Sequence, residues 1–522
     1  MSQAEGLTPI RFGTDGWRAV IAEAFTFANL ERVAQAYADY LIQQSAAQGQ
    51  GPNAPSLLKQ LVDVGQISQE EADTSLFRNV ILKAEGEKAS QAAQAQAPLV
   101  IIGYDRRFLS EKFAVCAAEV LRGNGLRVAM FEEAVPTPLV SWAVKDAGAK
   151  GGIVITASHN PPEFNGFKIK APWGGSASPE ITSAVEALVD SQAPRRQSDA
   201  MPHESEMLQH AIDSYRAQIA SYIDLERLRR TRLKTIVDSM HGSGGRWVES
   251  FLEGRDLRCE TIRAGRDPLF GGVNPEPIDR NLAPLKSRVR ETGAILGLAT
   301  DGDADRLGAV NELGETMTMH EVVPLMLLHL ARERKMRGGV VRTFSQSVLT
   351  KRIAVAHNLP VYDTAIGFKY IADLMLKSDI LLGAEESGGI GVKGHIPERD
   401  GILNCLLLLE AMITSGKPPS QMVKEMHREF GEFYFGRRDI HCEVGQGQEL
   451  VSKLATSPPN DVAAFRVMDV ETLDGTKLLF EDESWLLFRQ SGTEPALRIY
   501  SEATSVAKMN SLLAEGEQLA HA

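Results

Sequence analysis

Cysteine and long apolar runs are both scarce in this sequence. Its 522 residues include only four cysteines, which lie far apart at Cys116, Cys259, Cys405 and Cys442. Because no CxxC pair is present, neither a cysteine-ligated zinc site nor a disulfide scaffold is indicated. The most apolar run, Leu403 to Ile413, is interrupted by Glu410 and is too short to span a bilayer. The start of the chain shows no apolar signal segment, so we expect a cytoplasmic protein with no membrane partner.

The chain also lacks an excess of positive charge. It has 56 Lys and Arg against 68 Asp and Glu, a formal net charge of -12. A general nucleic-acid binder depends on basic residues that neutralise phosphates, so we expect no nucleic-acid partner. The composition is 43% hydrophobic and 24% charged, as in an ordinary globular protein. At roughly 100–200 residues per domain, the length predicts three or four domains.

Strand-like and helix-like segments alternate through three blocks of the chain. The first block contains the apolar run Leu99–Tyr104, which predicts a buried strand, followed by the amphipathic helix Glu111–Arg122. The same alternation returns from Lys234 and again from Gly339. Strands that alternate with helices indicate parallel sheet built from βαβ units. The sequence therefore predicts three related α/β modules. From about Phe433 to Tyr500 the pattern becomes strand-rich and then ends in a helix, which predicts a smaller α+β domain.

The stretch Gln44–Ala97 interrupts this alternation. It begins and ends in sequence rich in Gln, Ala, Gly and Pro, and two short helices are expected inside it, at Ser56–Val64 and Ser68–Lys83. We interpret it as a surface insertion. A regulatory or oligomerisation element is the alternative.

The segment Thr156–Lys170, TASHNPPEFNGFKIK, follows an apolar strand directly. Ligands of parallel α/β sheets collect at the carboxyl ends of strands, and Ser158 would lie at such an end. The serine is a candidate nucleophile or phosphate acceptor, and Lys168 could donate or accept a proton. A capped turn without chemistry is the alternative for this segment taken alone.

Three carboxylates, Asp301, Asp303 and Asp305, alternate along a loop after the apolar run AILGLA. Such spacing lets them converge on one hard cation. An EF-hand is rejected because Arg306 stands where that loop needs glycine and because the flanks resemble strands. Three oxygens leave room for a substrate, so we predict Mg²⁺ that also contacts a phosphate oxygen.

Two further loops carry polar groups. Gly383–Gly389 places Glu385, Glu386 and Ser387 after a strand, where they could bind sugar hydroxyls. Arg489–Pro495, with Arg498 beyond it, combines arginines, hydroxyls and a glycine-containing turn, which together suit a phosphate. An acidic loop and a plain hairpin turn are the respective alternatives.

These four segments, in this order, resemble the α-D-phosphohexomutase superfamily of phosphoglucomutases and phosphomannomutases. The opening FGTDGWRA at Phe12–Ala19 is similar to the family's first substrate loop. The resemblance covers the chain apart from Gln44–Ala97. It implies three similar mixed α/β domains around a cleft, plus a C-terminal α+β domain of the TATA-binding-protein-like type. We expect the domains at 1–192 (with the insertion at 44–97), 193–311, 312–425 and 426–522.

The resemblance also implies roles for individual residues. Ser158 matches the family's phosphoserine, which would complete the metal shell of the three aspartates. Lys168, Arg18 and His159 match residues near the reacting phosphate, and Lys168 is our choice of general acid/base. The matched substrate-binding residues are Arg306, Gly367, Lys369, Glu385, Ser387, Arg489, Ser491, Gly492, Thr493 and Arg498.

The implied activity is the interconversion of glucose 1-phosphate and glucose 6-phosphate, with Mg²⁺ and with hexose 1,6-bisphosphate as intermediate and activator. The AEESGG sugar loop favours glucose, but mannose or dual specificity and glucose 1,6-bisphosphate synthesis stay open. A metal-dependent sugar-phosphate phosphatase is the alternative from another class. We expect hexose phosphates as substrates and a monomer or weak dimer.

Overall fold

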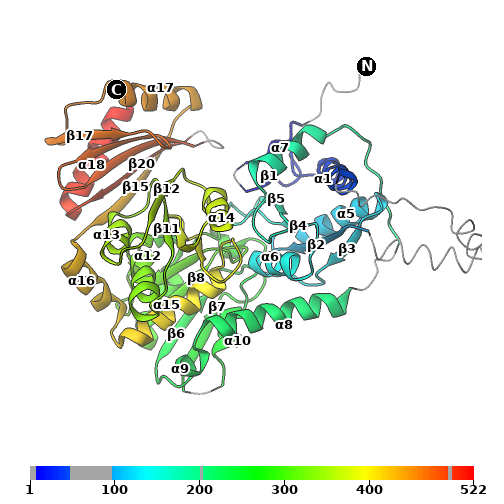
Figure 1. Ribbon diagram of the computed structural model, residues 1–522, viewed down its shortest axis with the longest axis horizontal. Coiled ribbons are helices and arrows are strands. Elements are labelled where there is room, and N and C mark those ends of the chain that lie inside the picture. The colour runs from blue at the N-terminus through cyan, green and yellow to red at the C-terminus, as the bar shows by residue number, and fades with distance from the viewer. Residues whose placement is uncertain are drawn as a thin grey trace, which may run out of the picture.

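The computed structural model describes residues 8–13, 15–47, 97–199, 204–254, 256–491 and 496–521. The two helices expected at Ser56–Val64 and Ser68–Lys83 lie outside these residues, as do Gly492 and Thr493. The described part of the chain forms four sheets, three of mixed strand direction and one antiparallel. This arrangement confirms the predicted fold class (Figure 1).

The first sheet has the strand order β1-β5-β4-β2-β3. In β2 the sequence LVIIGY is rich in β-branched residues and is buried on both faces, as expected of a central parallel strand. The strands are β1 (Trp17–Val20), β2 (Leu99–Tyr104), β3 (Arg127–Met130), β4 (Gly151–Ile155) and β5 (Phe164–Lys170). The helices beside them are α1 (Phe27–Ala47), α5 (Ser110–Gly123), α6 (Thr137–Asp146) and α7 (Pro179–Leu188).

The second sheet has the order β10-β9-β8-β6-β7, which repeats the first except that its outer strand β10 comes last in the chain, whereas β1 comes first. Its strands are β6 (Lys234–Asp238), β7 (Arg258–Ile262), β8 (Leu296–Thr300), β9 (Leu307–Val310) and β10 (Thr316–Met317). Its helices are α8 (Ser205–Tyr222), α9 (Leu225–Arg229), α10 (Trp247–Leu252) and α11 (Ala283–Thr292), with 3-10 turns at Phe270–Gly272 and Asp279–Asn281. Helix α8 also packs on α6 of the first domain and so runs along both domains (Figure 1).

The third sheet has the order β14-β13-β11-β12, which matches β5-β4-β2-β3 and β9-β8-β6-β7 of the other two and lacks only their outer strands β1 and β10. Its strands are β11 (Gly339–Thr343), β12 (Val361–Thr364), β13 (Ile380–Ala384) and β14 (Ile390–Val392). Its helices are α12 (Met319–Leu328), continued by a π-helical turn at His329–Glu333, α13 (Val348–Ala356), α14 (Phe368–Lys377), α15 (Gly401–Ser415) and α16 (Pro419–Phe430).

Helix α15 contains the most apolar run of the chain. Its first turn is capped by Asp400, which accepts the amide N–H groups of Ile402 and Leu403, both at 3.0 Å. It ends at Gly416, whose φ of 65° is the left-handed conformation that glycine adopts most easily. Nearly all of its side chains are buried, so the run forms a core helix. No helix in the described ranges is long and apolar enough to cross a membrane.

The fourth sheet is antiparallel in the order β15-β20-β19-β18-β17-β16. Its strands are β15 (Tyr434–His441), β16 (Asp461–Val462), β17 (Phe465–Glu471), β18 (Thr476–Phe480), β19 (Trp485–Gln490) and β20 (Ala496–Ala503). Helices α17 (Val444–Thr456) and α18 (Val506–His521) pack against it. The largest hydrophobic core runs through the first three domains and reaches Trp485 and Tyr500 of the fourth.

The repeated topology places three loops at equivalent positions. In each mixed sheet, a parallel strand is followed by an antiparallel neighbour, and a short loop joins the two. These loops join β4 to β5, β8 to β9 and β13 to β14. They carry Ser158, the three aspartates and Glu385 respectively. Three of the four segments singled out in the sequence are therefore the same structural loop in three successive domains.

Candidate active site

The Ser158 loop is shaped by a buried arginine from another segment. Arg107 donates hydrogen bonds from Nη2 to the carbonyl oxygens of Ser158 and Asn160, both at 2.7 Å, and from Nη1 to those of Pro161 and Phe164. Its Nε lies 3.1 Å from Oδ2 of Asp105, and both side chains are fully buried. Four carbonyls of one loop thus converge on a single guanidinium. These bonds hold the backbone of Ser158 in a left-handed conformation, with a φ of 53°.

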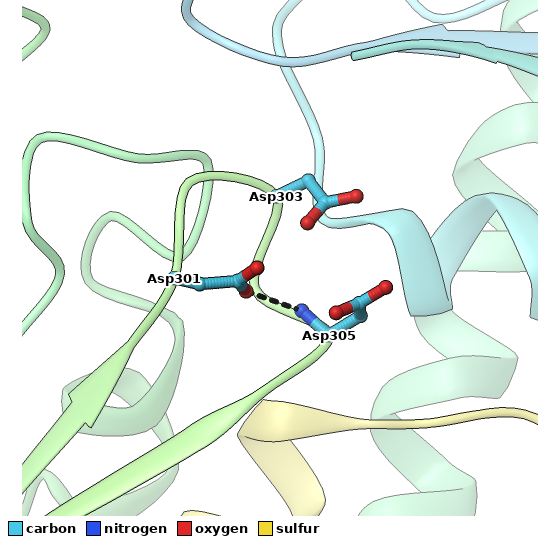
Figure 2. A group of neighbouring side chains, drawn as sticks. All are labelled: Asp301, Asp303 and Asp305. Carbon is cyan, nitrogen blue, oxygen red and sulfur yellow. Dashed lines mark hydrogen bonds between the residues drawn. The ribbon is translucent and has the colours of Figure 1, made fainter. Parts of the chain in front are cut away.

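The three aspartates lie on the loop between β8 and β9, directly opposite Ser158. Figure 2 shows their carboxylates gathered around this loop, with Asp301 accepting the amide N–H of Asp305 at 3.0 Å. The Ser158 hydroxyl donates to Oδ2 of Asp301 at 2.8 Å. The structure therefore brings the predicted nucleophile and the predicted metal loop into direct contact.

The aspartate cluster fits a divalent cation. One carboxylate oxygen from each residue lies within 4.8 Å of the others, and all three residues are buried. Oδ1 of Asp303 and Oδ1 of Asp305 are buried without a hydrogen-bond partner, which is costly unless a ligand binds there. Burial, followed by the charges of Asp303 and Asp305, raises the pKa of Asp301 well above its ordinary value. A bound cation would offset this repulsion, and oxygen ligands suit Mg²⁺.

Lys168 of β5 supplies positive charge to the same cluster. Its Nζ lies 2.8 Å from Oδ2 of Asp303, 3.3 Å from Oδ2 of Asp305 and 2.8 Å from Oδ2 of Asp15. Burial alone would lower the pKa of Lys168, but these carboxylates outweigh it and raise the pKa above its ordinary value. The amine is therefore protonated in this arrangement, and its general acid/base role stays a prediction.

Two more predicted residues flank Ser158. Arg18 of β1 donates to Oδ1 of Asn160 at 2.6 Å, two residues beyond the serine. Nδ1 of His159 lies 3.4 Å from the Ser158 hydroxyl oxygen. Burial, together with Arg306 and Arg18, lowers the pKa of His159 well below its ordinary value, so the imidazole is neutral. A neutral ring can accept or donate one hydrogen bond without adding charge.

The loop with Glu385 pairs directly with the predicted metal loop. Arg306 and Gly389 form an antiparallel bridge, and the Leu307 amide donates to the Gly388 carbonyl at 3.0 Å. Glu385 is 6% exposed, and burial raises its pKa to about 7. Ser387 is half-buried on the same loop. The predicted sugar loop and the predicted metal loop are thus held in fixed register.

Arg399 was not singled out in the sequence, yet it joins three of these loops. This buried guanidinium lies 2.7 Å from Asp15, 2.8 Å from Asp305 and 3.5 Å from Glu385. The three partners come from different domains. The sequence around Arg399, PERDG ahead of α15, shows only alternating charges. Such a pattern does not reveal which carboxylates the arginine contacts.

The predicted phosphate residues lie on the fourth domain. Arg489 of β19 and Arg498 of β20 occupy directly opposed positions in the sheet, and Ser491 follows β19. Oδ2 of Asp474 accepts from Nε of Arg489 at 3.0 Å. In the third domain, Gly367 precedes α14 with a φ of 139°, and Nζ of Lys369 lies 5.1 Å from the centre of the Tyr370 ring. Gly492 and Thr493 are not among the described residues.

The domains match models of a known enzyme family. Phosphoglucomutase/phosphomannomutase alpha/beta/alpha domains I, II and III match residues 65–196, 213–314 and 319–430, and the C-terminal domain of that family matches residues 449–518. The chain is 33% identical over 443 residues to a phosphoglucomutase/phosphomannomutase of Thermococcus kodakarensis, covering 84% of this chain and 91% of that one. It is 27% identical over 415 residues to a phosphoglucosamine mutase of Novosphingobium aromaticivorans, covering 79% and 88%.

A solved structure agrees with this match. The crystal structure of a candidate phosphomannomutase from Thermus thermophilus superposes with a TM-score of 0.78 at 34% identity, covering 99% of this chain and 100% of that one. Fold and site together define a four-domain phosphohexomutase. The chain belongs to the phosphoglucomutase/phosphomannomutase family within the α-D-phosphohexomutase superfamily, and it is an enzyme of the mutase type.

Proposed function

We propose that this enzyme interconverts glucose 1-phosphate and glucose 6-phosphate through a phosphoserine at Ser158 and a hexose 1,6-bisphosphate intermediate, with Mg²⁺ bound by Asp301, Asp303 and Asp305. The observation that carries the proposal is the 2.8 Å contact between the Ser158 hydroxyl and Asp301 inside a buried aspartate cluster. A phosphoryl group on this oxygen would lie beside the predicted cation. Lys168 is available to balance its charge.

The chemical step is a phosphoryl transfer in two directions. The bond from phosphorus to Oγ of Ser158 breaks while protonated Lys168 gives its proton to that oxygen, a bond to a free sugar hydroxyl oxygen forms, and the neutral amine then takes up the hydroxyl proton. The same step in reverse returns the other phosphoryl group of the bisphosphate to Ser158. Bound Mg²⁺ would neutralise charge on the transferring group. Lys168 and Arg18 hold positive charge at this place, and we assign Lys168 as general acid/base.

The substrate must bind in two orientations, and this requirement assigns the remaining residues. The non-reacting phosphate binds at Arg489, Ser491, Gly492, Thr493 and Arg498. Glu385 and Ser387 bind a pair of sugar hydroxyls that changes little when C1 and C6 exchange places. Gly367, directly before α14, and Lys369, in the first turn of α14, contribute from the third domain. The sugar hydroxyls O3 and O4 keep nearly the same positions when C1 and C6 exchange places, whereas O2 does not.

Sugar choice is the first test. Relatives are named for glucose, mannose and glucosamine phosphates, so kcat/KM should be measured for the three 1-phosphates. The expected preference is glucose, because the AEESGG loop resembles that of glucose-preferring family members, although contacts to O3 and O4 alone should discriminate only weakly between glucose and mannose. Glu385→Ala should lower activity on glucose and mannose by similar factors, about ten- to a hundredfold, because a hydrogen bond to a charged group is worth roughly 1.5–3 kcal/mol. A loss confined to glucose would show that Glu385 contacts the hydroxyl at C2 and would refute this binding mode.

Reaction type is the second test. Conversion of glucose 1-phosphate should be followed by phosphorus NMR with and without glucose 1,6-bisphosphate. A mutase produces glucose 6-phosphate and responds to the bisphosphate. Accumulation of glucose 1,6-bisphosphate from another phosphoryl donor would indicate the synthase, and steady release of inorganic phosphate would indicate the phosphatase. A cytoplasmic monomer or weak dimer stays a prediction.

A further inference from the structure

One carboxylate oxygen joins the third domain to the fourth. Oδ2 of Asp474 accepts a hydrogen bond from Nε of Arg489 at 3.0 Å and another from the backbone amide of Ile366 at 2.8 Å. Arg489 lies on β19 of the fourth domain, and Ile366 lies in the loop between β12 and α14 of the third. Asp474 therefore connects the predicted phosphate arginine to the segment at 364–369, which carries the predicted substrate-binding residues Gly367 and Lys369.

The backbone forces Asp474 into this position. It lies in the turn between β17 and β18, and the next residue, Gly475, has a φ of 97°. A Cβ atom at Gly475 would lie 2.3 Å from the carbonyl oxygen of Phe488, so only glycine lets the turn approach β19 this closely. As a result, the Asp474 side chain reaches the arginine one residue beyond Phe488.

The hydrogen bond has a directional consequence for Arg489. A guanidinium is planar, so a partner fixed at Nε sets the plane in which the two Nη groups lie. Those groups form the forked edge that binds a phosphate in a bidentate manner. The second bond, to Ile366, fixes the backbone immediately before Gly367.

We propose that Asp474 is a positioning residue that fixes Arg489 and the segment at 364–369 relative to each other. Binding of the substrate's distal phosphate then orders both. This inference rests on the proposed function, because it takes Arg489 as a phosphate ligand. A competing view treats Asp474 only as a negative charge near the phosphate site. The two views predict opposite changes in anion affinity when the carboxylate is removed. Loss of positioning weakens anion binding, whereas loss of a negative charge strengthens it.

Calorimetric titration of the full chain with glucose 6-phosphate and with inorganic phosphate separates these views. Asp474→Ala should raise both dissociation constants about tenfold, as loss of one charge-assisted contact does. Asp474→Asn keeps an acceptor oxygen and should fall between wild type and Asp474→Ala. Asp482→Ala is the matched control. Asp482 also lies in a turn of the fourth domain, but it binds Lys508 and Thr504, so its variant should bind like wild type.

Hydrogen exchange of the 361–370 segment gives a readout that a general loss of stability does not reproduce. In wild type, glucose 6-phosphate should slow exchange in this segment and in β19 together. In Asp474→Ala, protection of 361–370 should be lost while the Asp482→Ala control keeps it. Unchanged or tighter binding by folded Asp474→Ala, or retained protection of 361–370, overturns the inference and leaves the proposed function standing. Failure of wild type to bind either probe overturns both.

Discussion

The hydroxyl of Ser158 donates a hydrogen bond to Asp301 across 143 residues of sequence, and the two oxygens lie 2.8 Å apart. Each residue sits at the same place in its own domain, in the loop between a parallel strand and its antiparallel neighbour. The contact arises because two copies of one topology face each other. The position of the predicted nucleophile and that of the predicted metal site are therefore set by the same kind of loop in two successive domains.

We predict that Ser158 carries a phosphoryl group in the active enzyme. Intact mass should show a species heavier by about 80 Da, one phosphoryl group, that maps to the peptide containing Ser158. Ser158→Ala should remove both this species and mutase turnover, because it deletes the hydroxyl that faces Asp301. Ser214→Ala, on α8 outside the site, should retain both. Wild-type turnover in Ser158→Ala would contradict the phosphoserine mechanism.

We predict that the aspartate cluster binds a divalent cation independently of substrate. Asp303→Asn removes one charge from an oxygen cluster and should weaken Mn²⁺ binding, followed by electron paramagnetic resonance, by at least about tenfold. Chelation should abolish turnover and Mg²⁺ should restore it. Asp279→Asn serves as a control, because Asp279 pairs with Lys286 at the surface. Equal Mn²⁺ affinity in Asp303→Asn and wild type would show that the cluster is only a turn.

We predict that Arg399 is required for both stability and activity. Arg399→Met would leave the carboxylates of Asp15, Asp305 and Glu385 without this partner, and breaking a buried ion pair typically costs about 3–5 kcal/mol. Arg399→Lys restores the charge but not the fork of donors, so it should recover part of the melting temperature and little of kcat/KM. Arg332→Met removes a surface pair with Glu429 and should change stability by less than about 1 kcal/mol. Full activity of Arg399→Lys would show that charge alone suffices.

Much of the fold could be predicted because buried parallel strands have a distinctive sequence. The strand predicted at Leu99–Tyr104 is β2 with the same bounds, and the alternation predicted from Lys234 begins with β6 at Lys234–Asp238. The antiparallel strand β5 was missed, because Phe164–Lys170 contains Asn165, Lys168 and Lys170 and looks like a polar loop. In the structure both lysines are fully buried, and Lys170 pairs with Glu398 of the third domain at 2.7 Å. Such a strand is stable only with partners from elsewhere, which local sequence does not reveal.

The residues of the candidate site likewise include some that the sequence could identify and others that it could not. Residues within motifs, such as Ser158 and the three aspartates, could be identified because several chemical groups share one short loop. Arg107 could not, because the sequence DRR after β2 looks like an exposed charged turn, yet the side chain is completely buried under the Ser158 loop. Asp474 was missed for a similar reason. Its two partners lie in different domains, and only the folded chain brings them together.

The last prediction concerns the pH dependence of stability at Glu385. Burial raises the pKa of Glu385 to about 7, whereas an unfolded chain gives about 4.3. The folded protein therefore favours the protonated carboxyl, and the stability this provides is present at low pH and is lost as the pH rises through 7. At about 1.4 kcal/mol per pKa unit, the loss amounts to about 4 kcal/mol at most.

Glu385→Gln keeps the size of the side chain but cannot ionise, so it is free of this penalty. The melting temperature of Glu385→Gln minus that of wild type, both measured without metal or substrate, should therefore become more positive between about pH 5 and pH 8. A difference that stays constant or falls over this range would show that Glu385 is ionised in the folded protein at neutral pH, held so by Arg399 at 3.5 Å.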